Sequence, residues 1–131
     1  SWRTTAARTE VHQSARLALE AMTRDLRLAS IIAWPPPGRS DSRVSIRTMD
    51  TNGKQIAIGF QQGLPDGGNS RTLYRNYAHG RPSPLARDVV SALRFEYSEP
   101  RLVKIALTLT DPQTGVQDSA TTAVTCVNVA E

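Results

Sequence analysis

The sequence predicts an α+β fold, in which one long N-terminal α-helix packs on an antiparallel β-sheet of about six strands. Apolar residues recur at intervals of three and four from Thr5 to Ala33, which is the spacing of a helix with one apolar face. The prolines at 35–37 end this pattern, and from residue 43 onward apolar residues alternate with polar ones, as in strands. With 131 residues, the chain has the length of a single domain built around one hydrophobic core.

The helix is predicted to end near residues 32 to 34, because a proline restricts the residue before it and lacks a backbone donor. Its apolar face should contact the sheet, and Ala18 and Ala33 extend that face. The residues predicted to make the helix–sheet packing are Val11, Ala15, Leu19, Met22, Leu26 and Ala29. We therefore divide the single domain into an amphipathic helix, residues 1–34, and a β-sheet head, residues 35–131.

Four arginines lie mostly off the apolar face of the predicted helix: Arg8, Arg16, Arg24 and Arg27. Glu20 stands four residues from both Arg16 and Arg24, and such pairs stabilise a helix by about 0.2–0.5 kcal/mol each. The guanidinium groups are therefore expected on the solvent side, where they can pair with acidic groups.

Strand and turn patterns alternate through the β-sheet head. The residues DTNG at 50–53 have the composition of a tight turn and predict a hairpin between the strands on either side. The residues DPQTG at 111–115 predict a second turn, in which Asp starts the turn, Pro sets the next φ and Gly accepts a positive φ. The polar stretches 61–70 and 78–84 are predicted to interrupt the strands as loops. The predicted strands are residues 43–49, 54–60, 71–77, 92–97, 101–110 and 121–129.

The charge balance is mildly basic, with 16 Lys and Arg residues against 12 Asp and Glu, a formal net charge of +4. Only Lys54 and Lys104 are lysines, and arginine pairs with carboxylates as well as phosphates, so the surface suits ion-paired protein contacts. No run of basic residues alternates with aromatics, so nucleic acid as a partner is allowed by the charge but not supported. The single cysteine, Cys126, excludes an intramolecular disulfide, and we predict it to be a small apolar residue on a strand.

No enzyme motif is visible in the sequence. The two histidines, His12 on the polar side of the helix and His79 in a Gly/Pro loop, have no obvious partners and are predicted to be solvated surface residues. The acidic turns at 50–53 and 66–69 offer too few oxygens for calcium. We therefore predict no catalytic residues, no metal and no cofactor, leaving open a metal site built from distant carboxylates such as Asp88.

Three segments, taken in order, resemble one known family. The residues ALEAMTRDLRLAS (18–30) end the helix, TLYRN (72–76) lies in the sheet, and LARDVVSALRFEYSEPRLVKIALTLTDPQTG covers 85–115. This order resembles the minor pilins of type IV pili and the J-type pseudopilin of type II secretion, the PilW/GspJ-like group. The chain departs from many major pilins in lacking a cysteine pair, and its connection SEPR (98–101) is short.

The resemblance implies a pilin-like fold and a non-enzymatic subunit that helps to assemble or prime a type IV pilus or a type II secretion pseudopilus. Its partners would be other minor pilins or pseudopilins, in a tip complex, and the major pilin. Proteins of this family carry an apolar half-helix that anchors them in the inner membrane, with the head in the periplasm, before they join the filament. No apolar run here could span a bilayer, so we expect that half-helix to precede Ser1. Arg8, Arg16, Arg24 and Arg27 would then dock against neighbouring subunits.

Two other functions stay open at the level of sequence. One is a filament-tip module that takes up DNA or adheres to a surface through the arginine-rich face. The other is a small enzyme with an unrecognised site, which would need a pocket lined by paired titratable groups.

Overall fold

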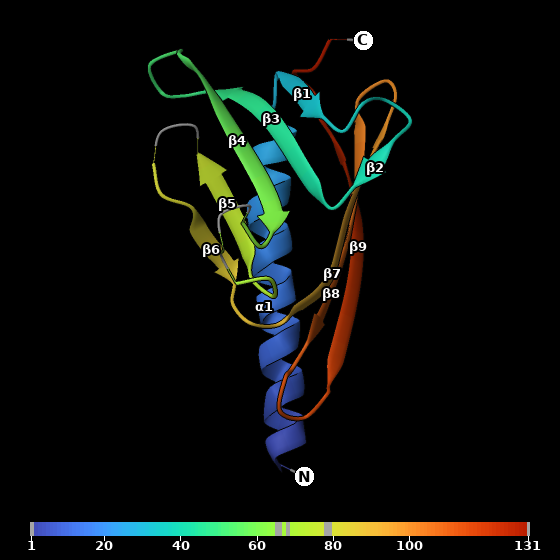
Figure 1. Ribbon diagram of the computed structural model, residues 1–131. Coiled ribbons are helices and arrows are strands. Elements are labelled where there is room, and N and C mark those ends of the chain that lie inside the picture. Colours follow the sequence, from blue (N-terminus) through green and yellow to red (C-terminus); the bar gives the residue numbers. More distant parts are fainter. Residues whose placement is uncertain (1, 65–66, 68, 78–79, 131) are drawn as a thin grey trace.

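The computed structural model describes residues 2–64, 67, 69–77 and 80–130 (Figure 1). In these residues, one N-terminal α-helix is followed along the chain by the strands of two antiparallel sheets. The helix α1 comprises Trp2–Arg27. In the described residues, the first sheet has the strand order β1-β3-β4-β5-β6 and the second sheet has the order β2-β7-β8-β9. The strands are β1 (Ile31–Trp34), β2 (Ser40–Asp41), β3 (Arg43–Met49), β4 (Gln55–Gln62), β5 (Leu73–Tyr77), β6 (Ser83–Ala86), β7 (Val90–Ser98), β8 (Leu102–Thr110) and β9 (Gln117–Thr125).

The helix lies lengthwise between the two sheets (Figure 1). It packs against β6, at one edge of the first sheet, and against β8 and β9, at one edge of the second. The sheets also contact each other directly, through β3 and β4 on one side and β7 on the other. The predicted α+β fold with a helix on antiparallel strands is therefore confirmed, but two sheets pack against one face of the helix where the sequence predicted one sheet.

The apolar face of α1 forms the centre of the core, together with the inward-facing residues of both sheets. Met22 and Leu26 are fully buried, and burying side chains of this size contributes about 1.5–3 kcal/mol each. Of the predicted packing residues, Leu19 is only half-buried at the margin of the core, and Ala29 is buried just beyond the helix end. The helical residues buried as predicted are Val11, Ala15, Ala18, Met22 and Leu26.

The helix ends earlier than the sequence pattern predicts. It stops at Arg27, and the residues that were expected to complete its last turns form β1 instead. Ile31 and Ile32 pair with Arg47 and Ile46 of β3, which gives their backbone groups partners outside a helix. β-branched side chains favour strands, so the pairing with β3 is preferred over another helical turn. Ala33, predicted on the apolar helix face, is consequently exposed on β1.

Both predicted turns are confirmed. At 50–53, the carboxylate of Asp50 accepts hydrogen bonds from the backbone N–H groups of Asn52 and Lys54 at 2.9 and 2.8 Å, and Gly53 has a φ of 77°. At 111–115, the carboxylate of Asp111 accepts from the backbone and the hydroxyl of Thr114, both at 2.8 Å. These bonds explain why the carboxylate of the first residue starts each turn.

The strand predictions hold for the centre of each sheet and fail at the edges. The hairpin β3–β4 and the inward alternation of β8 are as predicted, with Val103, Ile105, Leu107 and Leu109 buried. The last strand is Gln117–Thr125 rather than residues 121–129, because the tight turn returns the chain at once and pairs Gln117 with Thr110. Cys126 therefore lies just after a strand rather than on one, although it is fully buried. Strands β1, β2 and β6 were not predicted, and part of β6 lies in the stretch 78–84 that was predicted to be a loop.

Candidate functional site

A polar cavity lies between the helix and the start of β9. We call it the α1/β9 groove, and its volume is about 550 Å³. Its helical wall carries side chains from successive turns of α1, and its strand wall is the beginning of β9. The groove is lined by Arg8, Thr9, His12, Gln13, Arg16, Gln117 and Asp118.

A hydrogen-bonding contact between two side chains spans the groove. The Nδ1 atom of His12 lies 3.1 Å from the Oδ2 atom of Asp118, and the two side chains are 72% and 31% exposed. The prediction that His12 is a solvated surface residue is correct for its exposure but wrong in giving it no partner. The partner could not be found from the sequence because Asp118 is 106 residues away and reaches His12 only when β9 packs beside α1. His79 lies outside the described residues.

The four arginines predicted to dock partners are all exposed, but they do not form one site. Arg8 and Arg16 line the α1/β9 groove, whereas Arg24 and Arg27 lie near the helix C-terminus, outside it. The predicted pair between Arg16 and Glu20 forms, with Nε and Oε1 3.8 Å apart. Both side chains are about two-thirds exposed (66% and 64%), so the pair is weak. Among the described residues, no ion pair joins Glu20 to Arg24, which the spacing also allowed.

A buried ion pair that the sequence did not reveal fastens the helix to the first sheet. The Nε atom of Arg75 on β5 donates to the Oδ2 atom of Asp25 on α1 at 2.7 Å, and their side chains are only 19% and 11% exposed. The guanidinium carbon of Arg75 also lies 4.4 Å from the ring centre of Tyr77, within cation–π range. The pair adds a directional contact between α1 and β5 to the burial of the apolar helix face.

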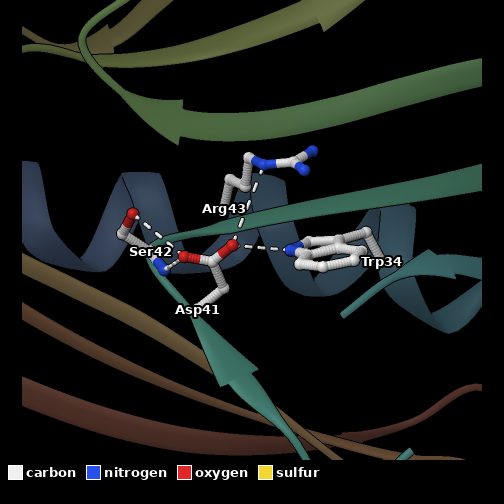
Figure 2. Close-up of polar contacts among 4 residues, drawn as sticks. All are labelled: Trp34, Asp41, Ser42 and Arg43. Carbon is white, nitrogen blue, oxygen red and sulfur yellow. Dashed lines mark hydrogen bonds and ion pairs between the residues drawn. The ribbon is translucent and has the colours of Figure 1, made fainter. Parts of the chain in front are cut away.

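A second polar cluster joins the two sheets at one corner (Figure 2). The indole Nε1 of Trp34, on β1, donates to Oδ2 of Asp41 on β2 at 2.6 Å, while the backbone N–H of Ser42 donates to Oδ1 at 2.7 Å. Arg43 stacks on the Trp34 ring, with its guanidinium carbon 4.9 Å from the ring centre. The indole hydrogen bond, followed by the Ser42 backbone, lowers the pKa of Asp41. Because both carboxylate oxygens accept bonds from the protein, we interpret this cluster as a structural corner.

The outer face of the second sheet has a smaller depression, with a volume of about 380 Å³. Its charged residues are Arg94, Glu96 and Lys104, and Glu96 stands directly opposite Lys104 in the register of β7 and β8. Opposite charges directly across a strand pair attract each other, so Glu96 and Lys104 partly neutralise one another there.

Nothing in the described residues forms a metal centre. No group of three or more His, Cys, Asp and Glu residues gathers there. The carboxylate of Asp50 is used by its own turn, and Asp88 is hydrogen-bonded to Asn69. Asp66, in the second acidic turn, lies outside the described residues.

The comparisons decide no family. No protein-family model, no curated protein and no solved structure matches the chain significantly. Within the described residues, no helix combines the length and the apolarity needed to cross a membrane.

Proposed function

We propose that the chain is a non-enzymatic assembly subunit, a minor pilin or pseudopilin that helps to assemble or prime a type IV pilus or a type II secretion pseudopilus. The observation that carries the proposal is the placement of α1. This helix of 26 residues is held along one side by two sheets and leaves its other side exposed along its whole length. Such a helix can pack against other helices while its head stays attached.

Close packing and an ion pair attach the helix to the head. Small residues on the buried face, Ala7, Ala15 and Ala18, let the backbone of α1 approach the strands closely. The ion pair between Asp25 and Arg75 adds a directional bond at the C-terminal part of the helix. These contacts join the helix to the head, which is compatible with the role of a filament subunit.

The exposed side of α1 carries both apolar and basic groups. Trp2 is 79% exposed and Leu17 is 52% exposed, and the four arginines of the helix are exposed at different places along it. Exposed charges at the rim of an interface steer and select partners more than they tighten binding. This composition suits contacts with neighbouring pilins or pseudopilins, including the major pilin.

The reactive groups of the described residues favour a structural role over a catalytic one. Cys126 is fully buried, and this burial raises the pKa of its thiol to about 11, so the nucleophilic thiolate is scarce at neutral pH. His12 is paired with Asp118, but no serine, threonine or cysteine lies within hydrogen-bond distance of its ring in the described residues.

The proposal includes a location. As the resemblance implies, an apolar half-helix ahead of these residues would anchor the subunit in the inner membrane, with the head in the periplasm. After assembly, the subunit would belong to a filament in the periplasm or at the cell surface.

The test is deletion of the gene in the organism that encodes it, with the full-length gene supplied on a plasmid as the control. We expect loss or strong reduction of surface filaments in electron micrographs, or of secreted proteins in the culture medium, and restoration by the plasmid. Unchanged filaments and unchanged secretion would refute the proposal. Normal filaments combined with lost DNA uptake or lost adhesion would replace it with the tip-binding module.

A further inference from the structure

We infer that the α1/β9 groove binds an acidic segment of a neighbouring subunit, with one partner carboxylate at Arg8 and another at Arg16. The identity of the partner as a filament subunit rests on the proposed function. The chemistry of the partner rests on the groove itself.

The groove presents a row of nitrogen-bearing side chains along the helix. Arg8, His12 and Arg16 are four residues apart in turn, so they follow one another at about 6 Å along the axis of α1. Arg8 and Arg16 are thus separated by about 12 Å along the axis, measured at the backbone. A segment with two carboxylates about two helical turns apart can place one carboxylate at each of these arginines.

The charges in the groove are incompletely neutralised. Among the described residues that line it, Asp118 is the one acidic side chain, and it is paired with His12. Arg8 has no ion pair with any described residue, and the ion pair of Arg16 is the long, exposed one with Glu20. Arginine binds carboxylates through two parallel hydrogen bonds, so these two groups are suited to carboxylates supplied from outside.

The remaining lining residues favour a peptide over a nucleic acid. Thr9, Gln13 and Gln117 carry hydroxyl and amide groups that can donate to and accept from a peptide backbone. Binding of single-stranded nucleic acid commonly uses aromatic side chains on which bases stack, and none is among the described lining residues. The groove therefore matches an acidic protein segment better than a phosphate backbone.

Asp118 has a defined role in this arrangement. Its carboxylate occupies the strand wall and repels an incoming carboxylate, while its contact with His12 keeps the imidazole beside β9. Replacing it with Asn removes the negative charge at nearly constant shape. The variant Asp118→Asn should therefore bind an acidic segment more tightly than the unmodified chain.

The test uses fluorescence anisotropy with a labelled, alanine-rich helical peptide of about 20 residues that carries two glutamates two helical turns apart. The matched peptide has glutamine at both positions. We expect the variants Arg8→Gln and Arg16→Gln each to raise the Kd of the glutamate peptide about tenfold. The variants Arg8→Lys and Arg16→Lys should recover part of this lost affinity, because lysine keeps the positive charge but cannot form the two parallel hydrogen bonds. The variants Arg24→Gln and Arg27→Gln are the matched controls on the same helix and should change the Kd less than about twofold.

Several outcomes would overturn the inference. These are equal binding of the two peptides, equal losses in the control variants, or tighter binding of a single-stranded oligonucleotide that depends on the same Arg8 and Arg16. Thermal unfolding of each variant verifies that the fold is retained.

Tests in cells separate this inference from the proposed function. If gene deletion abolishes filaments but the double variant of Arg8 and Arg16 assembles normally, the groove inference fails and the proposed function stands. If deletion leaves filaments and secretion unchanged while peptide binding requires both arginines, the proposed function fails and the acidic preference of the groove stands.

Discussion

Removing the carboxylate of Asp25 should destabilise the protein far more than removing an exposed carboxylate from the surface of a helix would. In the variant Asp25→Ala, the guanidinium of Arg75 loses the oxygen that now lies 2.7 Å from its Nε. The charge of Arg75 then remains in a site where its side chain is 19% exposed, held against the ring of Tyr77. Water can reach the vacated position only in part, so the desolvation of Arg75 is left uncompensated.

The expected magnitude follows from the burial of the pair. Removing one partner of a fully buried ion pair costs about 3–5 kcal/mol, and a charged hydrogen bond contributes about 1.5–3 kcal/mol. Because the two side chains keep 11% and 19% exposure, we expect a value near the overlap of these ranges, about 3 kcal/mol. For a chain of 131 residues, this corresponds to a fall in Tm of about 10 °C.

The assay is thermal and urea unfolding followed by circular dichroism, with Arg16→Ala as the matched control. That variant breaks an exposed pair, so it should change the free energy of unfolding by less than about 1 kcal/mol. The double variant Asp25→Leu, Arg75→Met replaces the charges with apolar groups and should recover most of the lost stability. Equal effects of Asp25→Ala and Arg16→Ala would refute the reasoning, as would a double variant no more stable than Asp25→Ala.

Three further predictions concern the core, the sheet corner and the thiol. Leu26→Asp should lower the free energy of unfolding by at least about 4 kcal/mol, because it buries an unpaired charge. The control Leu17→Asp changes a site that is 52% exposed and should lower the free energy of unfolding by less than about 1 kcal/mol. Similar urea midpoints for the two variants would contradict the helix packing. The pKa of Asp41 is lowered in the folded state, chiefly by the indole of Trp34, so its contribution to stability is present above its unfolded pKa of 3.8 and is lost as the pH falls through the lower folded pKa. As the pH is lowered from about 5 to about 2, the Tm of the variant Trp34→Phe should therefore fall less than the Tm of the unmodified protein. Parallel curves of Tm against pH for the two proteins would count against the hydrogen bond. Cys126 should react with a maleimide only after unfolding in urea, because burial shields the thiol and raises its pKa to about 11; rapid labelling of the native protein would show that the site is open.

The part of the fold that depends on neighbouring residues could be predicted from the sequence. The apolar spacing of Val11, Ala15 and Met22 specifies a helix face whatever covers it, and those residues are buried in the structure. The turn at 50–53 is specified in the same local way, since the Asp50 carboxylate bonds backbone N–H groups within four residues of itself. Local spacing and short-range hydrogen bonds require no knowledge of the remaining chain.

The end of the helix could not be predicted in this way. Residues 28–34 continue the apolar spacing, yet Ile31 and Ile32 form β1, because a strand with exposed backbone groups, β3, lies where they can pair with it. The choice between one more helical turn and an added strand depends on a tertiary partner. The division of the strands into two sheets has the same origin, since it depends on which distant strands pair with one another.

By itself, the sequence determined that this protein has an amphipathic helix followed by alternating strands, and that the helix is rich in arginine. Only the tertiary structure decided that His12 meets Asp118 across 106 positions and that Asp25 meets Arg75 across 50. It likewise decided that Arg8 and Arg16 line a groove while Arg24 and Arg27 do not. The physical reason is range: helical and strand spacing arise from contacts within a few residues, whereas ion pairs and grooves depend on the register in which distant segments pack.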